Sequence, residues 1–189
     1  MSYYKVLLVD DEVEVRDAIA RKLDWNALGF QVVGQAANGE EGLELSEQLK
    51  PDVIMTDIKM PFMDGLTFSR RAKEMLPYVK VAILSGFDEF DYAKEAIRLE
   101  VEEYILKPID AEELARVFLR LKALLDEEIA QRNDIQRLQH FYEESLPLMR
   151  QQLLSGLLSG RLTPEFIRQK TREYQMNLTA TQYGVAVVR

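Results

Sequence analysis

The sequence predicts an α/β fold built around a five-stranded parallel sheet. Five short apolar runs occur within the first 110 residues, and stretches with helical periodicity separate them. Alternating strands and helices are typical of a parallel sheet that helices cover on both faces. Polar residues suited to phosphate chemistry follow four of the five runs. Because ligands bind outside the carboxyl ends of parallel strands, these residues are expected to meet at one edge of the sheet.

The apolar runs define the expected strands. They cover residues 6–9, 31–36, 53–56, 81–84 and 104–106. The third run leads into Asp57 and is expected at the centre of the sheet, where burial is greatest. An unpaired carboxylate would be most costly there, so Asp57 is expected to have a cationic partner.

Capping residues mark the beginnings of two helices. Asn38 is followed three residues later by Glu41, and Asp110 by Glu113. This is the spacing of a capping box, in which the two side chains bind backbone N–H groups of the first turn. The second and the fifth helix are therefore expected to begin at these residues.

Apolar spacing predicts the remaining helices. The first covers about residues 14–23, the third follows residue 65, and the fourth covers about residues 90–99. The expected buried residues of the first and third are Val15, Ala18, Ile19, Leu23, Leu66, Phe68 or Ala72, and Met75.

The fifth helix is predicted to be unusually long, because neither glycine nor proline occurs between Ile109 and Pro147. Its apolar residues recur at heptad spacing, interrupted by Glu128, Arg132 and Gln139. The two rows of this seam are Leu114, Leu121, Ile135, Tyr142 and Met149, and Phe118, Leu125, Leu146 and Leu153. We expect one long helix, or two nearly continuous ones, that pairs with a partner helix.

The last part of the chain is expected to begin a second domain. A short helix should follow the N-cap Thr163 and Pro164 and extend to about Tyr174. Residues 183–188 form an apolar run with no following strand. We expect a first domain over residues 1–125, a helical linker and possible coiled coil over residues 126–150, and a truncated domain over residues 151–189.

Composition limits the classes of function. The net charge is −8 and the pI is about 4.9, which argues against most of the chain binding nucleic acid. Residues 150–189 carry +4 and residues 1–149 carry −12, an asymmetry most simply explained by a solvated helix face. No apolar run approaches the roughly 20 residues that span a bilayer. The absence of cysteine excludes thiolate metal sites and fits a cytoplasmic protein.

The residues after the strands predict a phosphate and metal site. Asp10 and Asp11 follow the first strand, Asp57 the third, Ser85 the fourth and Lys107 the fifth. Carboxylate oxygens suit Mg²⁺, which shares its coordination sphere with phosphate oxygens. A carboxylate such as Asp57 can attack phosphorus, and an ammonium and a hydroxyl would stabilise the phosphoryl oxygens.

Simpler explanations exist for each residue alone. Asp10 and Asp11 could merely cap the first helix, and Ser85 and Lys107 could be ordinary residues at strand ends. A cis bond before Pro108 would aim Lys107 at the site, but X-Pro bonds are cis in only about 5–6% of cases, so trans is expected. His140 is expected to be a surface or seam residue.

Four motifs in this order resemble a response regulator receiver domain of a two-component system, over about residues 3–125. They are Asp10-Asp11, the segment Thr56-Asp57-Ile58-Lys59-Met60-Pro61-Phe62-Met63-Asp64-Gly65, Leu84-Ser85-Gly86 and Tyr104-Ile105-Leu106-Lys107-Pro108. The resemblance implies a flavodoxin-like receiver fold with strand order 2-1-3-4-5. It also implies that a sensor histidine kinase phosphorylates the chain.

The resemblance assigns a role to each site residue. Asp57 would be the phosphoacceptor, and Mg²⁺ (or Mn²⁺) would be held by Asp11, Asp57 and the backbone carbonyl of Lys59, with Asp10 acting through water. Ser85 and Lys107 would contact the phosphoryl group, and Tyr104 would be the aromatic switch residue. Lys59 and Phe87 occupy positions that tune the phosphoryl lifetime in the family, and these residue types leave that rate open.

A narrower resemblance concerns YesN-like regulators. It rests on Asp24-Trp25, Gly29-Phe30 and the segment from Ser85 to Ala93. In that family a helical linker and a middle domain precede an AraC-type DNA-binding domain, which this chain lacks. The parent protein would bind DNA, and the chain would form a homodimer through the long helix and the face of the fourth helix, fifth strand and fifth helix. No membrane partner is expected.

Two other functions compete with a phosphorylation switch. Haloacid-dehalogenase-type phosphatases also use an aspartate nucleophile and Mg²⁺, but they need a second aspartate where Lys59 stands. A scaffold that dimerises through residues 114–153 without phosphorylation is the other alternative. Its dimerisation would not respond to beryllofluoride, a mimic of the phosphoryl group.

Overall fold

The computed structural model describes residues 3–86, 96, 99, 101–160 and 162–178. The chain divides into two compact units, Met1–Glu127 and Glu128–Arg189. The first contains one parallel sheet in the order β2-β1-β3-β4-β5, so the predicted sheet is confirmed. Its strands are β1 Tyr4–Val9, β2 Phe30–Ala36, β3 Val53–Asp57, β4 Lys80–Ser85 and β5 Glu103–Leu106.

Helices follow the strands in the predicted alternation. They are α1 Val13–Lys22, α2 Trp25–Leu28, α3 Gly39–Leu49, α4 Gly65–Met75 and α6 Ala111–Leu158. The short α2 was not predicted. The Asp24 side chain accepts a hydrogen bond from Ala27 N at 3.1 Å, and Gly29 ends the turn at φ +87°. The helix expected over residues 90–99 lies outside the described residues, except for Ala96 and Leu99.

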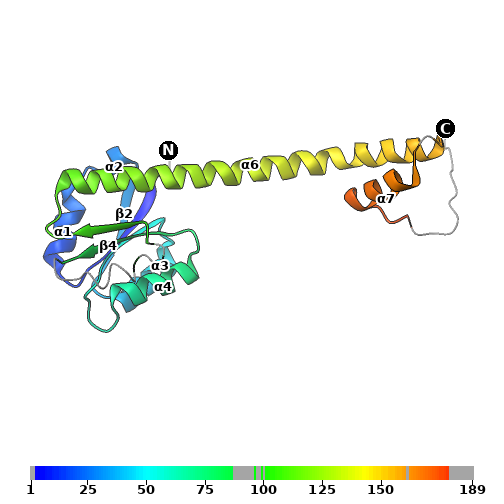
Figure 1. The fold of residues 1–189 in the computed structure, drawn as a ribbon. Coiled ribbons are helices and arrows are strands. Elements are labelled where there is room, and N and C mark those ends of the chain that lie inside the picture. Colours follow the sequence, from blue (N-terminus) through cyan, green and yellow to red (C-terminus); the bar gives the residue numbers. More distant parts are fainter. Residues whose placement is uncertain (1–2, 87–95, 97–98, 100, 161, 179–189) are drawn as a thin grey trace. The chain divides into compact units, whose positions relative to one another are not determined.

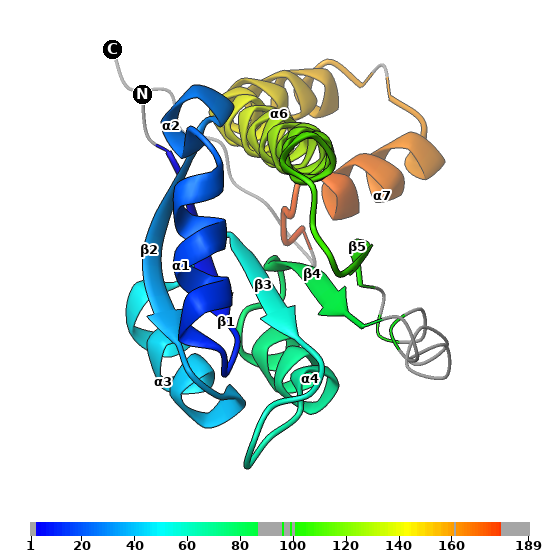
Figure 2. The same cartoon turned by 90° about the vertical axis from the view of Figure 1, so that its left-hand side faces the viewer.

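Alternate residues of the central strands face two separate apolar layers. Val6 and Leu8 of β1 pack with residues of α1 and α6, whereas Leu7 and Val9 pack with residues of α4. Figures 1 and 2 show α1 and α6 on one side of the sheet and α3 and α4 on the other. Burial of both faces explains why the strands are continuous apolar runs and do not alternate with polar residues.

Two residues predicted to be buried are exposed. Ala18 of α1 is exposed and lines an apolar pocket of about 320 Å³ between α1 and residues 107–109. Met75 is exposed at the end of α4, where Leu76 takes the inward position one residue later. The buried row of α4 runs through Leu66, Phe68 and Ala72 as predicted.

The predicted cap at Asn38 is present, with one shift in its reciprocal bond, and the helix predicted after Asp110 begins where expected. Asn38 Oδ1 accepts from Glu41 N at 3.0 Å, and α3 begins at the next residue. The Glu41 carboxylate accepts from Ala37 N at 2.7 Å, one residue before the N–H expected for a capping box. The long helix α6 begins at Ala111, immediately after Asp110.

The first part of α6 belongs to the core of the first unit. Its Phe118 ring packs edge-on at 4.6 Å from Trp25 and at 5.0 Å from Phe30, measured between ring centroids. Tyr4 OH donates to Asp126 Oδ1 at 2.6 Å near the end of this unit. Burial, and then the Asp126 carboxylate, raise the pKa of Tyr4 to about 12. These contacts fix α6 to β1 and the sheet.

The long helix is continuous from Ala111 to Leu158, with Pro147 inside it, as predicted for a single helix. The predicted partner seam is partly wrong. Leu114, Phe118, Leu121 and Leu125 are buried against the sheet and are closed to a partner. The heptad spacing in this part of the helix therefore serves the core of the domain.

The second unit begins within α6. In it α7, Pro164–Glu173, follows the predicted N-cap Thr163, whose hydroxyl accepts from Phe166 N at 3.3 Å. Tyr142 OH donates to the Glu173 carbonyl at 2.8 Å, and Arg150 Nε to the Tyr174 carbonyl at 2.9 Å. The run at residues 183–188 lies outside the described residues.

Across the described part of the chain, no helix combines the length and hydropathy needed to cross a membrane.

Candidate phosphoacceptor and metal site

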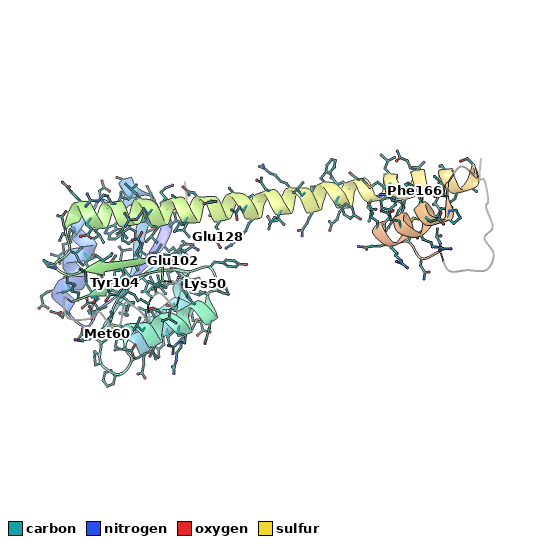
Figure 3. All side chains as sticks on the ribbon, in the orientation of Figure 1. Lys50, Met60, Glu102, Tyr104, Glu128 and Phe166 are labelled. Atoms are coloured by element: carbon teal, nitrogen blue, oxygen red, sulfur yellow. The ribbon has the colours of Figure 1, made fainter. Side chains whose placement is uncertain are left out.

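The predicted acids and lysine meet at the carboxyl edge of the sheet. Lys107 Nζ lies 2.5 Å from Asp57 Oδ1 and 3.0 Å from Asp10 Oδ2. β1 and β3 are neighbouring strands, so Asp10 and Asp57 extend their ends side by side, and Lys107 arrives from β5. In Figure 3, Met60 marks the loop at this edge, and Lys50 lies at the opposite end of the sheet.

Asp57 is the buried end of the central strand. Lys59 N donates to its Oδ2 at 2.8 Å. Burial raises the pKa of Asp57 and the charge of Asp10 adds to the increase, against the opposing effects of Lys107 and the Lys59 N–H. For Lys107, burial favours the neutral amine, but hydrogen bonds to Asp57 and Asp10 outweigh it and raise its pKa. The site therefore has more negative charge than one ammonium neutralises.

Local contacts hold these side chains in place. Asp10 Oδ1 accepts from Glu12 N at 2.9 Å, and the Arg16 guanidinium donates to the Asp10 backbone carbonyl. After β3, Gly65 N donates to the Ile58 carbonyl at 2.8 Å. A Cβ at Gly65 would lie 1.9 Å from the Asp57 carbonyl oxygen, so only glycine fits. Arg16 was missed in the sequence, because nothing in its spacing distinguishes it from a surface cation on the first helix.

Asp11 lies apart from the pair on Lys107. It is exposed and lines a pocket of about 610 Å³ together with Lys59, Met60 and Arg70, among other residues. Within the described ranges, no three acidic or histidine side chains are close enough to hold a metal by themselves. The acids therefore form an open site, with two carboxylates on Lys107 and the third on the pocket wall.

The predicted switch residues are joined by a hydrogen bond. Tyr104 OH donates to Ser85 Oγ at 2.6 Å, and Ser85 Oγ lies 3.1 Å from the Gly86 carbonyl, to which it donates. Ser85 is buried at the end of β4, and Lys107 N donates to its carbonyl at 2.7 Å. This backbone hydrogen bond thus links Ser85, at the end of β4, to Lys107, which directly follows β5.

Three other sequence predictions concern the bond before Pro108, His140 and Phe87. The Lys107–Pro108 peptide bond is cis, so the expectation of a trans bond was wrong. His140 is exposed on α6, 3.3 Å from Glu144 and remote in sequence from the site residues, as expected of a surface residue. Phe87 lies outside the described residues.

A parallel sheet in this order, with two acids and a lysine in contact at its carboxyl edge, defines a receiver-type α/β protein. Residues 6–118 match the family described as response regulator receiver domain. The chain belongs to this family of two-component signalling proteins.

Relatives narrow the comparison to transcriptional regulators. The chain is 35% identical over 157 residues to "Uncharacterized transcriptional regulatory protein YesN" of Bacillus subtilis, covering 83% of this chain and 43% of that protein. It is 33% identical over 128 residues to "Transcriptional regulatory protein HptR" of Staphylococcus aureus, covering 68% of this chain and 50% of the relative. The chain thus spans about half the length of these relatives.

Solved structures of response regulators resemble this chain as well. The receiver domain of AraT, a response regulator from Geobacillus stearothermophilus, is 44% identical with a TM-score of 0.65, covering 68% of this chain and 98% of that one. A two-component transcriptional regulator AraC from Clostridium phytofermentans is 29% identical with a TM-score of 0.61, covering 68% and 98%. The resemblance to YesN-like and AraC-type response regulators is confirmed.

Proposed function

We propose that this chain is a phosphorylation switch in which Asp57 accepts a phosphoryl group from the phosphohistidine of a sensor kinase. The observation that carries the proposal is the contact of Lys107 Nζ with Asp57 at 2.5 Å and with Asp10 at 3.0 Å. A buried nucleophile, a second acid and an ammonium at one edge are the groups that phosphoryl transfer requires.

The transfer moves one phosphoryl group between two proteins. A carboxylate oxygen of Asp57 forms a bond to phosphorus, and the P–N bond to the imidazole breaks, leaving its electron pair on that nitrogen. Lys107 stabilises the negative charge on the phosphoryl oxygens. The rate depends mainly on positioning, because the protein contributes little other covalent chemistry.

Receiver domains generally bind Mg²⁺ at an acidic pocket, and the donors here suit it. Asp11, Asp57 and the Lys59 carbonyl would hold the ion, with Asp10 acting through water; all are hard oxygen donors. Two carboxylates share the one ammonium of Lys107, and burial, with the charge of Asp10 adding to it, raises the pKa of Asp57. When bound, the ion would neutralise the carboxylates and phosphoryl oxygens.

The response to phosphorylation would begin at Ser85. Its hydroxyl accepts from Tyr104 and donates to the Gly86 carbonyl. On phosphorylation it would turn that proton to a phosphoryl oxygen and could keep the bond from Tyr104, because a hydroxyl can donate and accept at the same time. Movement of Ser85 would then draw Tyr104 inward and change β5. Leu106 on β5 and Leu119 on α6 are exposed, which supports a homodimer through this face and the long helix.

The parent protein would use this switch to regulate transcription. Two relatives are named as transcriptional regulatory proteins, and DNA binding would belong to a part outside this chain. The boundary between units at Glu127 and Glu128 supports a receiver domain over residues 1–125. The rest of the chain forms one unit, which we assign to a linker over residues 126–150 and the start of a middle domain over residues 151–189. The cysteine-free sequence supports a cytoplasmic location.

Labelling by acetyl phosphate tests the proposal. The purified chain with Mg²⁺ should acquire one phosphoryl group, and Asp57→Asn should abolish the labelling because the nucleophile is lost. Asp17→Asn is the matched control, since Asp17 is an exposed acid paired with Arg21 on α1. Labelling that survives in Asp57→Asn would remove Asp57 as the acceptor.

A further inference from the structure

Phe62 is the most exposed large apolar residue among those described, at 85%. Its backbone φ is +67°, in the left-handed region that side chains other than glycine and asparagine rarely adopt. A bulky residue held there without any compensating burial costs stability. Such strain often marks a functional position.

The loop contacts explain why Phe62 points outward. Met63 N donates to the Pro61 carbonyl at 2.8 Å, and Gly65 N to the Ile58 carbonyl at 2.8 Å. The next side chain, Met63, is buried in the core. The loop is therefore fixed on both sides of Phe62, which leaves its ring in solvent.

Phe62 lies in the loop that borders the phosphoacceptor site. It belongs to the loop that leaves Asp57, and the preceding residues Met60 and Pro61 line the same pocket as Asp11 and Lys59. Val13, at the start of α1, is 53% exposed and follows the acidic pair by two residues. Since β1 and β3 are adjacent, Val13 and Phe62 follow the ends of neighbouring strands that lead into the acids.

The burial of Asp57 determines how a donor must approach. Its side chain is only 11% exposed. The phosphorus atom of a donor therefore has to pass between the surrounding loops to reach the carboxylate. A small acyl phosphate has few atoms and covers little of the protein surface around Asp57. A protein donor has to bring its phosphohistidine to Asp57. The protein surface around that histidine then covers the loops around the site.

We propose that Phe62 is a specificity residue that docks against the phosphohistidine-bearing domain of the kinase and so favours protein donors over small phosphodonors. This rests on the proposed function of Asp57. Exposed aromatic rings are frequent anchors at protein interfaces, because they bury a large area with few rotatable bonds. The ring touches neither the phosphoryl group nor the metal ligands in this role.

Two donors and a small set of variants test this. The donors are acetyl phosphate and the autophosphorylated cytoplasmic fragment of a sensor kinase that labels the wild-type chain. Phe62→Gly and Phe62→Asn remove the ring and tolerate positive φ, so they keep the loop conformation. Phe62→Trp keeps an aromatic ring. Tyr78→Ala is the control, because Tyr78 is a 58% exposed aromatic in the loop before β4, at the opposite edge of the sheet.

The expected result is a loss of kinase transfer alone. Phe62→Gly and Phe62→Asn should lower kcat/KM for the kinase fragment about tenfold, the usual effect of removing an interface anchor. Labelling by acetyl phosphate should stay at the wild-type rate, and Phe62→Trp and Tyr78→Ala should behave as wild type with both donors.

Two outcomes would overturn the inference. If kinase transfer is unchanged in both ring-removing variants, Phe62 makes no contact that matters. If both donors lose activity equally, the residue acts on the geometry of the site and not on the donor. Failure of the proposed function would look different, since acetyl phosphate would then fail to label the wild-type chain.

Discussion

At the scale of single residues, Asp57 combines burial with an incomplete set of cationic partners. Lys107 lies 2.5 Å away, but the ammonium is shared with Asp10, and the pKa of Asp57 remains raised by burial. A carboxylate in this state is costly for the folded protein whenever it is ionised. The cost would fall when a divalent cation or a phosphoryl group enters the site.

This cost predicts a pH-dependent gain in stability for Asp57→Asn. A raised pKa means that the unfolded chain ionises first, so the wild type loses stability as pH rises from about 4 through the folded pKa of Asp57. Without Mg²⁺, the unfolding free energy of Asp57→Asn relative to wild type should therefore increase between pH 4 and pH 7. Urea unfolding in EDTA measures it.

Two observations would attribute the pH-dependent stability difference between wild type and Asp57→Asn to the Asp57 carboxylate. The raised pKa of Lys107 adds stability that is lost only as pH rises from about 10.4 through the folded value, outside this window. Added Mg²⁺ should stabilise the wild type more than Asp57→Asn, because the variant lacks one ligand. A stability difference that does not change with pH would show that Asp57 bears no such cost.

Residue identities at the site could largely be predicted, but not their pairing. Parallel strands bring their carboxyl ends together, so acids and lysine after those strands had to share one edge. That Lys107 would bridge Asp10 and Asp57 while Asp11 stays on the pocket wall depends on side-chain rotamers. The exposed ring of Phe62 depends on a loop closed by Ile58 and Gly65, a contact that local sequence does not encode.

At the scale of elements, α6 has two parts with different physical roles. Its first turns complete the core through Leu114, Phe118 and Leu121, whereas every residue from 130 to 144 is exposed. Heptad spacing alone could not separate these parts, because a helix on a sheet and a helix in a coiled coil both repeat their apolar residues every three or four positions.

Truncating one phenylalanine in each part of α6 should show the difference. Phe118→Ala removes a ring packed between Trp25 and Phe30 and should cost about 3–5 kcal/mol of unfolding free energy. Phe141→Ala, at an exposed position, should change it by no more than about 0.5 kcal/mol in the monomer. Chemical denaturation at low protein concentration measures both. Equal losses would contradict the assignment of α6 to two parts.

The sequence predicted the strands and caps well because their signals are local. Apolar runs bounded by polar residues and N-cap spacing require no knowledge of tertiary contacts. The misplaced residues Ala18 and Met75 depend on what lies opposite: a pocket beside α1, and Leu76 taking the inward position beyond α4. The single turn α2 has too few residues for periodicity to detect.

At the scale of the whole molecule, the exposed middle of α6 requires an explanation. A solvated helix of this length is only marginally stable in water unless something packs against it. Ile135 of the first predicted row and Leu138 are exposed there at a spacing of three residues, as in one turn of a coiled-coil seam. Leu138 replaces the neighbouring Gln139, which interrupts the second predicted row. A second copy of the chain would cover these residues, consistent with the proposed homodimer.

Cysteine cross-linking tests this pairing without a background, because the chain has no native cysteine. With Mg²⁺ and beryllofluoride, Ile135→Cys and Leu138→Cys should each form a disulfide dimer under mild oxidation, since each seam position meets itself in a parallel pair. Asn133→Cys, on the opposite helix face, should remain monomeric. Cross-linking at position 133 alone would contradict this seam, and equal yields without beryllofluoride would favour a scaffold independent of phosphorylation.

If the acids and lysine at the edge of the sheet direct a phosphoryl group to Asp57, that side chain alone becomes an aspartyl phosphate. Borohydride reduction of the chain after treatment with acetyl phosphate, followed by tandem mass spectrometry, tests it most directly, because it converts an aspartyl phosphate into homoserine. We expect homoserine at position 57 with Mg²⁺ and none with EDTA. Homoserine at position 10 or 11, or none at any position with Mg²⁺, would contradict it.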